Sequence, residues 1–289
     1  MATLLFKLIF APVMLATTAL VGRRWGAAVA GALAALPVTA GSIAFFVSLE
    51  QSAAFGSRTA VATLVGVGSL AWFSLGYAHL SRRFGWPVCL AVGYLIVAVA
   101  SVAVVPLANA PGFLVLGFVL LTLALASRLM PPAQASPRQT PPAWDIPARM
   151  LTGAVLVIVL TALAPALGPQ LSGLLAAVPM LSSVLLVFTH RHEGGERARG
   201  ILRGFVAGLV GTSLFLEIVA DGVVPLGIGP AFALASAACL GYGALAIRWI
   251  SRPAGATDAA AADPATDATG ATDGESLRAA TSASLNPGR

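Results

Sequence analysis

Long apolar stretches, each bounded by a short polar or basic segment, follow one another along most of the chain. A helix needs about 20 apolar residues to cross the roughly 30 Å hydrocarbon layer of a bilayer. Each stretch therefore predicts a membrane-spanning helix, and nine are expected. Their ranges are 2–20, 25–49, 58–80, 86–106, 111–130, 147–165, 168–190, 200–220 and 225–250.

The chain contains an internal repeat. Gly31–Pro37 returns at Gly173–Pro179 with five of seven positions identical, an offset of 142 residues. A fixed offset of this kind indicates two copies of one structural unit. The first apolar stretch alone would also fit a signal peptide, but it aligns with about 144–162 and is expected to be a helix of the repeat. The same offset relates Gly26 to Gly168, Phe46 to Phe188, Gly66 to Gly208 and Ala78 to Ala220.

Cationic residues fall on one set of loops. The first, third, fifth and seventh loops and the segment after the ninth helix hold thirteen arginines, and the opposite face holds only Lys7 and Arg58. Cytoplasmic loops carry an excess of Lys and Arg, so the N-terminus is expected outside and the C-terminus in the cytoplasm. The thirteen are Arg23, Arg24, Arg82, Arg83, Arg128, Arg138, Arg149, Arg191, Arg197, Arg199, Arg203, Arg248 and Arg252.

Helices one to four match helices six to nine, and the fifth is an unpaired connector. Because the connector makes the second unit start from the opposite face, the two four-helix units are expected to be inverted. The predicted divisions are 1–106 for the first unit, 107–146 for the connector helix and a Pro-rich cytoplasmic linker, and 147–252 for the second unit. Residues 253–289 lack apolar content and are expected to be a disordered cytoplasmic tail.

Composition agrees with an all-α integral membrane protein. Hydrophobic residues make up 58% of the chain and charged residues 10%, too little charge for a soluble surface. The net charge of +6 does not indicate nucleic-acid binding, because the arginines lie in loops between apolar spans. Cys89 and Cys239 are expected to be packing residues. His190 and His192 are expected at a helix end rather than in a metal site, and no cofactor motif or catalytic constellation indicates an enzyme.

Pro37 and Pro179 are expected near the bilayer centre. Proline leaves a carbonyl of the preceding turn without its helical partner, and in hydrocarbon that group needs another partner. Broken helices that meet at the midplane form the binding site of many secondary transporters; the alternative is that the prolines are structural kinks. With the prolines, the expected substrate-binding residues are Thr39, Ser42, Ser182 and Ser183.

Glu217 is an ionisable residue inside an apolar span, about a turn from the outer end of the eighth helix. Such groups usually face a cavity or a partner. Lys7 lies at a similar depth, and Glu50 lies near the same face, so these three are the expected ion-coupling residues, with Lys7 and Glu217 as a candidate charge pair. The alternative is that both side chains reach the headgroups by snorkelling. Gly66 and Gly208 are interpreted as close-packing positions.

The spacing of Gly31, Pro37, Glu50 and Arg58 resembles the small four-span bacterial inner-membrane proteins of the GlpM type. The first half, residues 1–106, is similar to one such unit, whereas the second half has His192 where Glu50 would match. The resemblance implies a four-helix fold unit and the bacterial inner membrane, but no activity. The inverted pair of four-helix units also resembles the drug/metabolite transporter architecture.

The expected function is a secondary transporter or permease of a small molecule, working by alternating access around the proline-broken helices. The alternative is a non-transporting scaffold, lipid-handling or accessory protein. Expected partners are the lipid bilayer, a small-molecule substrate, a proton and, as an option, a second copy of the chain. A hydrated pocket formed by the hydroxyl residues would favour transport, and a dry bundle would favour a scaffold.

The repeat generates a topology prediction. With nine spans, a tag at residue 1 and a tag at residue 289 should be accessible from opposite sides of the membrane, the first outside and the second inside. Labelling with a membrane-impermeant reagent in intact and in opened cells measures this. Both tags on the same side would rule out the inverted pairing.

Overall fold

The computed structural model describes residues 2–133, 141–159 and 179–250, and every regular element in these ranges is helical. The elements are α1 (Ala2–Trp25), α2 (Ala27–Ala34), α3 (Val38–Glu50), α4 (Ala53–Leu80), α5 (Trp86–Val104), the 3-10 helix η1 (Val105–Asn109), α6 (Gly112–Leu129), helical residues 145–159, α8 (Met180–Leu226) and α9 (Ile228–Ile250).

Six helical segments of the described ranges are long and apolar enough to cross a membrane. They are Ala27–Glu50, Ala53–Leu80, Trp86–Asn109, Gly112–Leu129, Leu181–Leu226 and Ile228–Arg248. The chain is therefore a multi-pass helical membrane protein, as composition predicts. The expected count of nine depends partly on residues 160–178, which lie outside the described ranges, as do much of the Pro-rich linker and the tail.

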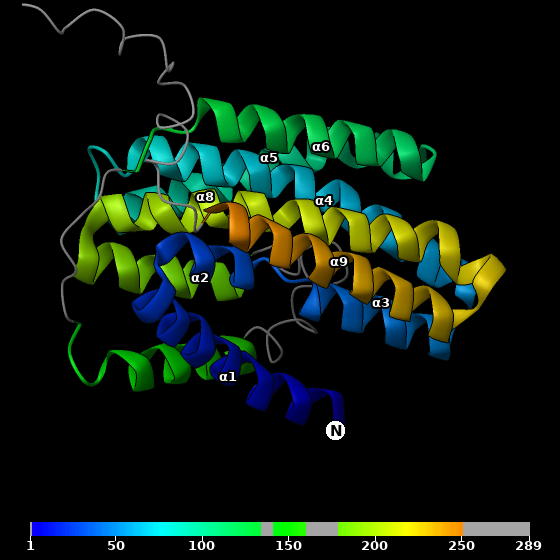
Figure 1. Cartoon of the computed structure of the whole chain (residues 1–289), viewed down its shortest axis with the longest axis horizontal. Helices are drawn as coiled ribbons and strands as arrows, with labels where there is room; N and C mark the ends of the chain where they lie inside the picture. The colour runs from blue at the N-terminus through cyan, green and yellow to red at the C-terminus, as the bar shows by residue number, and fades with distance from the viewer. Residues whose placement is uncertain (1, 134–140, 160–178, 251–289) are drawn as a thin grey trace, which may run out of the picture. The chain divides into compact units, whose positions relative to one another are not determined.

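The predicted helix 25–49 is interrupted at Pro37. α2 ends at Ala34, and α3 begins at Val38 with Pro37 as its N-cap residue. The backbone N–H of Val38 donates to the Leu36 carbonyl (2.8 Å) and that of Gly41 to the Pro37 carbonyl (2.6 Å). Proline lacks the N–H that would continue the ladder, so the chain makes a tight turn and restarts. Figure 1 shows the two half-helices, both blue, in succession on either side of this break.

α8 consists of two helical segments that double back at Gly194, as the yellow-green ribbon of Figure 1 shows. Gly194 has φ 87° and ψ 173°, a conformation that side chains with a Cβ atom rarely adopt. The segments are 180–193 and 195–226. The sequence predicted two separate helices here, and the sharp turn is the boundary between them.

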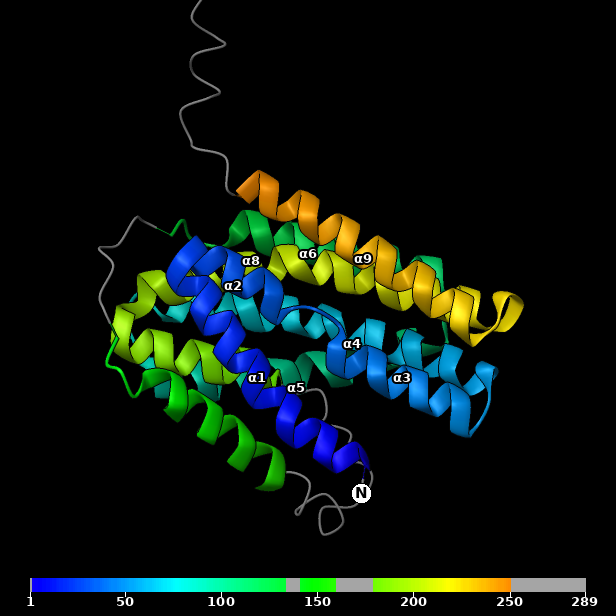
Figure 2. The same cartoon turned by 60° about the horizontal axis from the view of Figure 1, so that its bottom comes forward.

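α4 and α8 form the centre of the bundle, with α5, α6 and α9 packed around them (Figures 1 and 2). Phe73, Tyr77 and Leu202 are fully buried between these helices. The outer helices present large apolar side chains outward, such as Leu95 on α5 and Leu240 on α9, which are 63% and 62% exposed. In a membrane these faces contact lipid, so their exposure is expected.

α2 lies unusually close to α8. Gly200, Gly204 and Gly208 recur every four residues on one face of α8. A methyl group at Gly204 would overlap the Ala28 carbonyl, and one at Gly208 would lie 2.6 Å from the Ala32 carbonyl oxygen. Small residues of this spacing let helices approach backbone to backbone in lipid. The interpretation of Gly208 as a packing position is thus confirmed.

Gly31 belongs to the same contact, on the α2 side. A methyl group there would overlap the backbone carbonyl of Ile201. The glycine that begins the repeated motif is therefore a contact residue between α2 and α8. Gly66 has nothing within 4 Å of its added methyl position among the described residues, so its packing role stays a prediction.

The arginine-bearing ends of several helices meet at one end of the bundle, here called the basic end. Arg199 of α8 donates to the Ser81 hydroxyl after α4 (3.4 Å), and Arg203 donates to the Pro131 carbonyl after α6 (3.1 Å). Arg23 at the end of α1 reaches Asp145 at 2.9 Å. The predicted gathering of arginines on one face therefore holds for these loops.

Enlarging Gly204 should destabilise the bundle. Gly204→Ala forces the Ala28 carbonyl away, and overpacking of this kind costs about 1–3 kcal/mol of unfolding free energy. Gly241→Ala on α9 is the matched control, because nothing lies within 4 Å of its added methyl group. Unfolding of the purified protein by SDS titration in mixed micelles measures both. Equal stability of the two variants would contradict the close contact.

Candidate functional site

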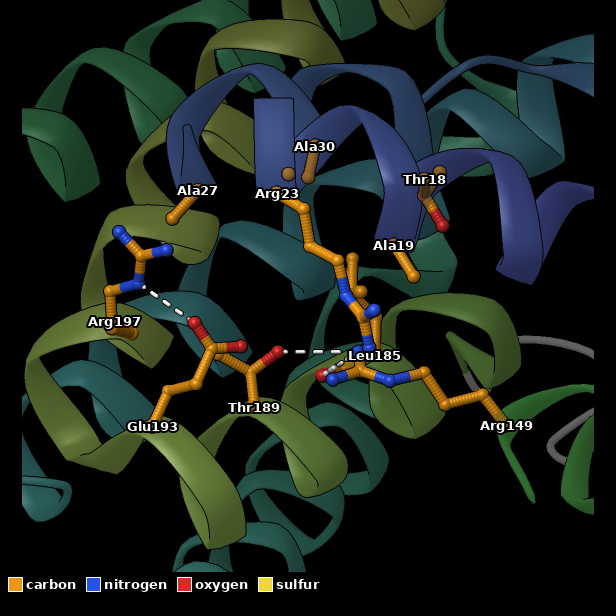
Figure 3. A pocket seen from close by; sticks show the side chains of 11 residues that line it. Thr18, Ala19, Arg23, Ala27, Ala30, Arg149, Leu185, Thr189, Glu193 and Arg197 are labelled. Atoms are coloured by element: carbon orange, nitrogen blue, oxygen red, sulfur yellow. Dashed lines mark hydrogen bonds and ion pairs between the residues drawn. The ribbon is translucent and has the colours of Figure 1, made fainter. Parts of the chain in front are cut away.

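A small cavity lies at the basic end, between α1, α2, helical residues 145–159 and α8 (Figure 3). Its volume is about 20 Å³, enough for one water molecule or a small ion. Polar side chains form much of its wall, and we call it the arginine cavity. These polar residues are Thr18, Arg23, Arg149, Thr189, Glu193 and Arg197.

Asp145 binds two of these arginines from behind the wall. Its Oδ2 accepts hydrogen bonds from Arg23 Nη2 and from Arg149 Nε, each at 2.9 Å. Asp145 is completely buried, and Arg149 is only 2% exposed. Its second oxygen, Oδ1, has no hydrogen-bond partner in the part of the chain that the structure describes. A buried carboxylate between two guanidinium groups fixes the positions of both.

Arg149 is held on its other sides by α8. Its Nη1 donates to the Thr189 hydroxyl (3.3 Å) and towards the Leu185 carbonyl (3.4 Å). The guanidinium also lies 5.4 Å from the ring centre of Phe188, a cation–π contact. With contacts on several sides, this guanidinium has one well-defined orientation beside the cavity.

The opposite wall is an ion pair within α8. Arg197 Nε donates to Glu193 Oε2 at 3.0 Å, and both side chains are largely buried. Figure 3 shows Glu193 of this pair beside Thr189, with Arg149 reaching Thr189 from the other side. The wall therefore carries three guanidinium groups and one carboxylate, and Asp145 adds a second carboxylate behind it.

Local sequence explains this assembly. Asp145 is the first helical residue of 145–159, where a carboxylate is favoured by the free N–H groups of the first turn. Arg149 follows one turn later on the same face. Leu185, Thr189 and Glu193 recur every four residues, so they form one stripe along the first segment of α8. The fold brings the stripe against Arg149.

A backbone carbonyl next to the Pro37 break is bound by a side chain of another helix. Ala35 precedes the break, and its carbonyl accepts a hydrogen bond from the Thr212 hydroxyl of α8. Thr212 is only 5% exposed, so this bond is shielded from solvent. The carbonyl that loses its donor because Pro37 lacks an N–H is that of Leu33, four residues earlier, and it accepts from the Leu36 N–H (3.2 Å) within the turn.

The predicted substrate-binding hydroxyls lie in different environments. Thr39 is exposed, and Ser42 is half-buried with its hydroxyl on the Val38 carbonyl (2.6 Å). Ser182 and Ser183 are buried in the first turn of α8, directly after Pro179. The arginine cavity is lined by other residues. The assignment of these four hydroxyls to a substrate site stays a prediction.

The predicted ion-coupling residues lie towards the other end of the bundle. A methyl group at Gly112, where α6 begins, would lie 2.8 Å from Glu217 Oε1 and 3.2 Å from Asp221 Oδ1. The described neighbour of Glu217 is therefore another carboxyl group. Glu50 is exposed at the end of α3. Lys7 belongs to α1, but the structure describes only its backbone, so the pairing of its side chain with Glu217 stays a prediction.

The two histidines near the α8 turn have separate neighbours. His190 Nδ1 lies 3.1 Å from the Tyr77 hydroxyl, whereas the His192 ring packs edge-on against Trp144 at 5.3 Å. Among the described residues, no group of three or more His, Cys, Asp or Glu side chains could hold a metal ion.

The arginine cavity was not predicted from the sequence, because its arginines were interpreted only as an orientation signal. One signal was present. Asp145 is the only acidic residue between Glu50 and Glu193, and Arg149 follows it at the i+4 spacing of a helical ion pair. Nothing in the sequence indicated that Arg23 and α8 would meet this pair.

Comparison of the chain with family models, with curated proteins and with solved structures gave no match in any of the three.

Loss of Arg149 should be strongly destabilising. Arg149→Gln leaves the buried Asp145 with Arg23 alone, and breaking a buried ion pair costs about 3–5 kcal/mol. The double variant Asp145→Asn/Arg149→Gln removes the stranded charge and should recover part of this loss. Arg197→Gln should cost less than Arg149→Gln, because both members of its pair keep some contact with solvent (16% and 11% exposed). SDS titration of all three variants measures this order, and no recovery in the double variant would contradict it.

Proposed function

We propose that this protein is a secondary transporter that moves a small solute by alternating access around two proline-started helices. The observation that carries the proposal is the equivalence of Pro37 and Pro179. Each is the N-cap residue of a helix, with φ of −78° and −76°. In each case the N–H four residues later donates to the proline carbonyl, at 2.6 Å for Gly41 and 2.8 Å for Ser183.

Helix boundaries support a duplicated unit. α3 begins at Val38 and α8 at Met180, and α5 begins at Trp86 and α9 at Ile228. Both pairs are separated by the 142 residues of the sequence repeat. The second segment of α8 follows the turn at Gly194 and begins at residue 195, again 142 residues after the start of α4 at Ala53.

Helix contacts follow the same correspondence. α4 packs against α5, and the long segment of α8 packs against α9, which are the pairs that the repeat makes equivalent. α4 and α8 also contact each other at the centre of the bundle. In an inverted pair, this central contact lies on the pseudo-twofold axis.

The arginine cavity fits one half of a transport pathway. Its wall comes from α2 and from the first segment of α8, the two half-helices on the basic-end side of Pro37 and Pro179. The ion pairs Arg23–Asp145 and Arg197–Glu193 border it. In the proposed orientation the basic end is cytoplasmic, so the cavity belongs to the cytoplasmic half of the pathway.

Glu217 is the proposed proton-coupling group. Its carboxyl lies beside that of Asp221 at the start of α6, near the end of the bundle opposite the arginine cavity. Two neighbouring carboxyl groups can share one proton. Located towards the outer end, such a pair suits coupling to an inward proton gradient.

The resemblance of the first unit to GlpM-type proteins leads us to propose the bacterial inner membrane as the location. The second candidate function is a non-transporting scaffold, lipid-handling or accessory protein. The hydrogen bond from Thr212 to the Ala35 carbonyl favours it, because at this break a side chain takes the place of water or substrate.

Cysteine accessibility separates the two functions without knowledge of the substrate. Position 182 is buried in this conformation (3% exposed for Ser182), and Ser182→Cys is made in a Cys89→Ala/Cys239→Ala background. If the protein alternates, a membrane-impermeant thiol reagent should modify the introduced thiol from the outer side in cells and from the inner side in inverted vesicles, each at a measurable rate.

Ser74→Cys in the same background is the matched control, since Ser74 is fully buried within α4 and bonded to the Leu70 carbonyl. Its thiol should resist the reagent from both sides. If the Ser182→Cys thiol were as unreactive as the control thiol from both sides, the result would favour the scaffold and remove alternating access.

A further inference from the structure

We infer that the arginine cavity binds a small monovalent anion of about the size of chloride. The binding does not depend on transport, but the identification of this anion as the carried solute rests on the proposed function. The observations are the charge of the wall, its hydrogen-bond donors and its volume.

Charge favours an anion over a cation. Arg23, Arg149 and Arg197 contribute three positive charges, and Glu193 and Asp145 contribute two negative charges, which leaves one positive charge in excess. Arg23 is 35% exposed, but Arg149 and Arg197 are only 2% and 16% exposed, so water and counter-ions compensate the charge of these two guanidinium groups poorly. One monovalent anion neutralises the cluster.

Donors are present on both sides of the cavity. A guanidinium has five N–H donors; Arg23 gives one to Asp145 and Arg197 gives one to Glu193, which leaves donors on both for a ligand. The Thr189 hydroxyl accepts from Arg149, so its own proton can point to an anion. Figure 3 shows these groups converging from α1 and α8.

Asp145 makes the site rigid before any ligand binds. It holds Arg23 and Arg149 at 2.9 Å each, from a fully buried position behind the wall. Their guanidinium groups thus need no reorganisation on binding, which favours affinity.

Size limits the ligand. A volume of about 20 Å³ fits a single small ion. A water molecule is the competing occupant, since it also fits a polar cavity of this volume. Water neutralises no charge, so the two occupants are distinguished by the response to chloride.

The test uses the full purified chain in detergent, in chloride-free gluconate buffer. Radiolabelled chloride is added at constant ionic strength, and binding is measured by equilibrium dialysis. The expected result is saturable binding of one chloride per chain, accompanied by a rise in the thermal unfolding midpoint. Bromide should compete, and gluconate should not.

Arg197→Gln and Thr189→Val should each lower chloride affinity at least tenfold. Thr189→Val keeps the side-chain shape and guards against a variant that fails to fold. Arg203→Gln is the matched control, because Arg203 lies at the same end of the bundle but binds the Met130 and Pro131 carbonyls. Its chloride affinity should equal that of the wild type.

Absence of saturable chloride binding to monodisperse wild-type protein would overturn the inference and leave water as the occupant. Binding that neither cavity variant weakens would place the anion elsewhere and overturn the inference too.

Chloride flux into proteoliposomes is a separate measurement. Binding without flux supports the anion site but not its identification as the carried solute, whereas two-sided reactivity of the Ser182→Cys variant without chloride binding supports transport of another solute.

Discussion

The backbone contact between α2 and α8 is the constraint on which the other features depend. Between lipid-embedded helices there is little hydrophobic driving force, so close van der Waals packing must hold them together. Gly31 and Gly204 allow the two backbones to touch. This approach puts Thr212 within reach of the Ala35 carbonyl and brings the end of α1 over the first segment of α8. Without this contact, neither the hydrogen bond from Thr212 to the Ala35 carbonyl nor the arginine cavity would form.

The buried charges at the basic end illustrate how a membrane protein tolerates ionised groups. Asp145 and Arg149 are both almost completely inaccessible, yet each has an oppositely charged partner at 2.9 Å. Pairing of this kind is a weak source of stability, since both groups lose their hydration. It does specify one geometry, because any arrangement that separates the two groups leaves a buried charge without a partner. The cluster therefore joins α1, helical residues 145–159 and α8 in one register.

Sequence patterns were sufficient for the broad architecture. Apolar stretches predicted the spanning helices. In lipid the backbone must satisfy its own hydrogen bonds, so a long apolar stretch is expected to be a helix. The break at Pro37 followed from the missing N–H of proline. Gly194 was harder, since glycine is common in membrane helices and its positive φ is visible only in the fold.

The polar contacts could not be predicted in the same way. Asp145 and Arg149 are close in sequence, but Arg23 lies 122 residues before Asp145 and meets the pair only through packing. The Thr212 bond to Ala35 likewise depends on the relative shift of two helices. A shift of one residue along either helix would change the partner, and hydropathy carries no information about such a shift.

The break between Ala34 and Val38 separates two helices, α2 and α3, that pack against different neighbours. α2 is joined to α8 by the glycine contact, whereas α3 packs against α4. The short linker thus connects two helices with different main packing partners. Any displacement of α3 relative to α2 would have to be taken up there, by torsion about a few backbone bonds. Ala35 would stay with α2 in such a displacement, because Thr212 holds its carbonyl against α8.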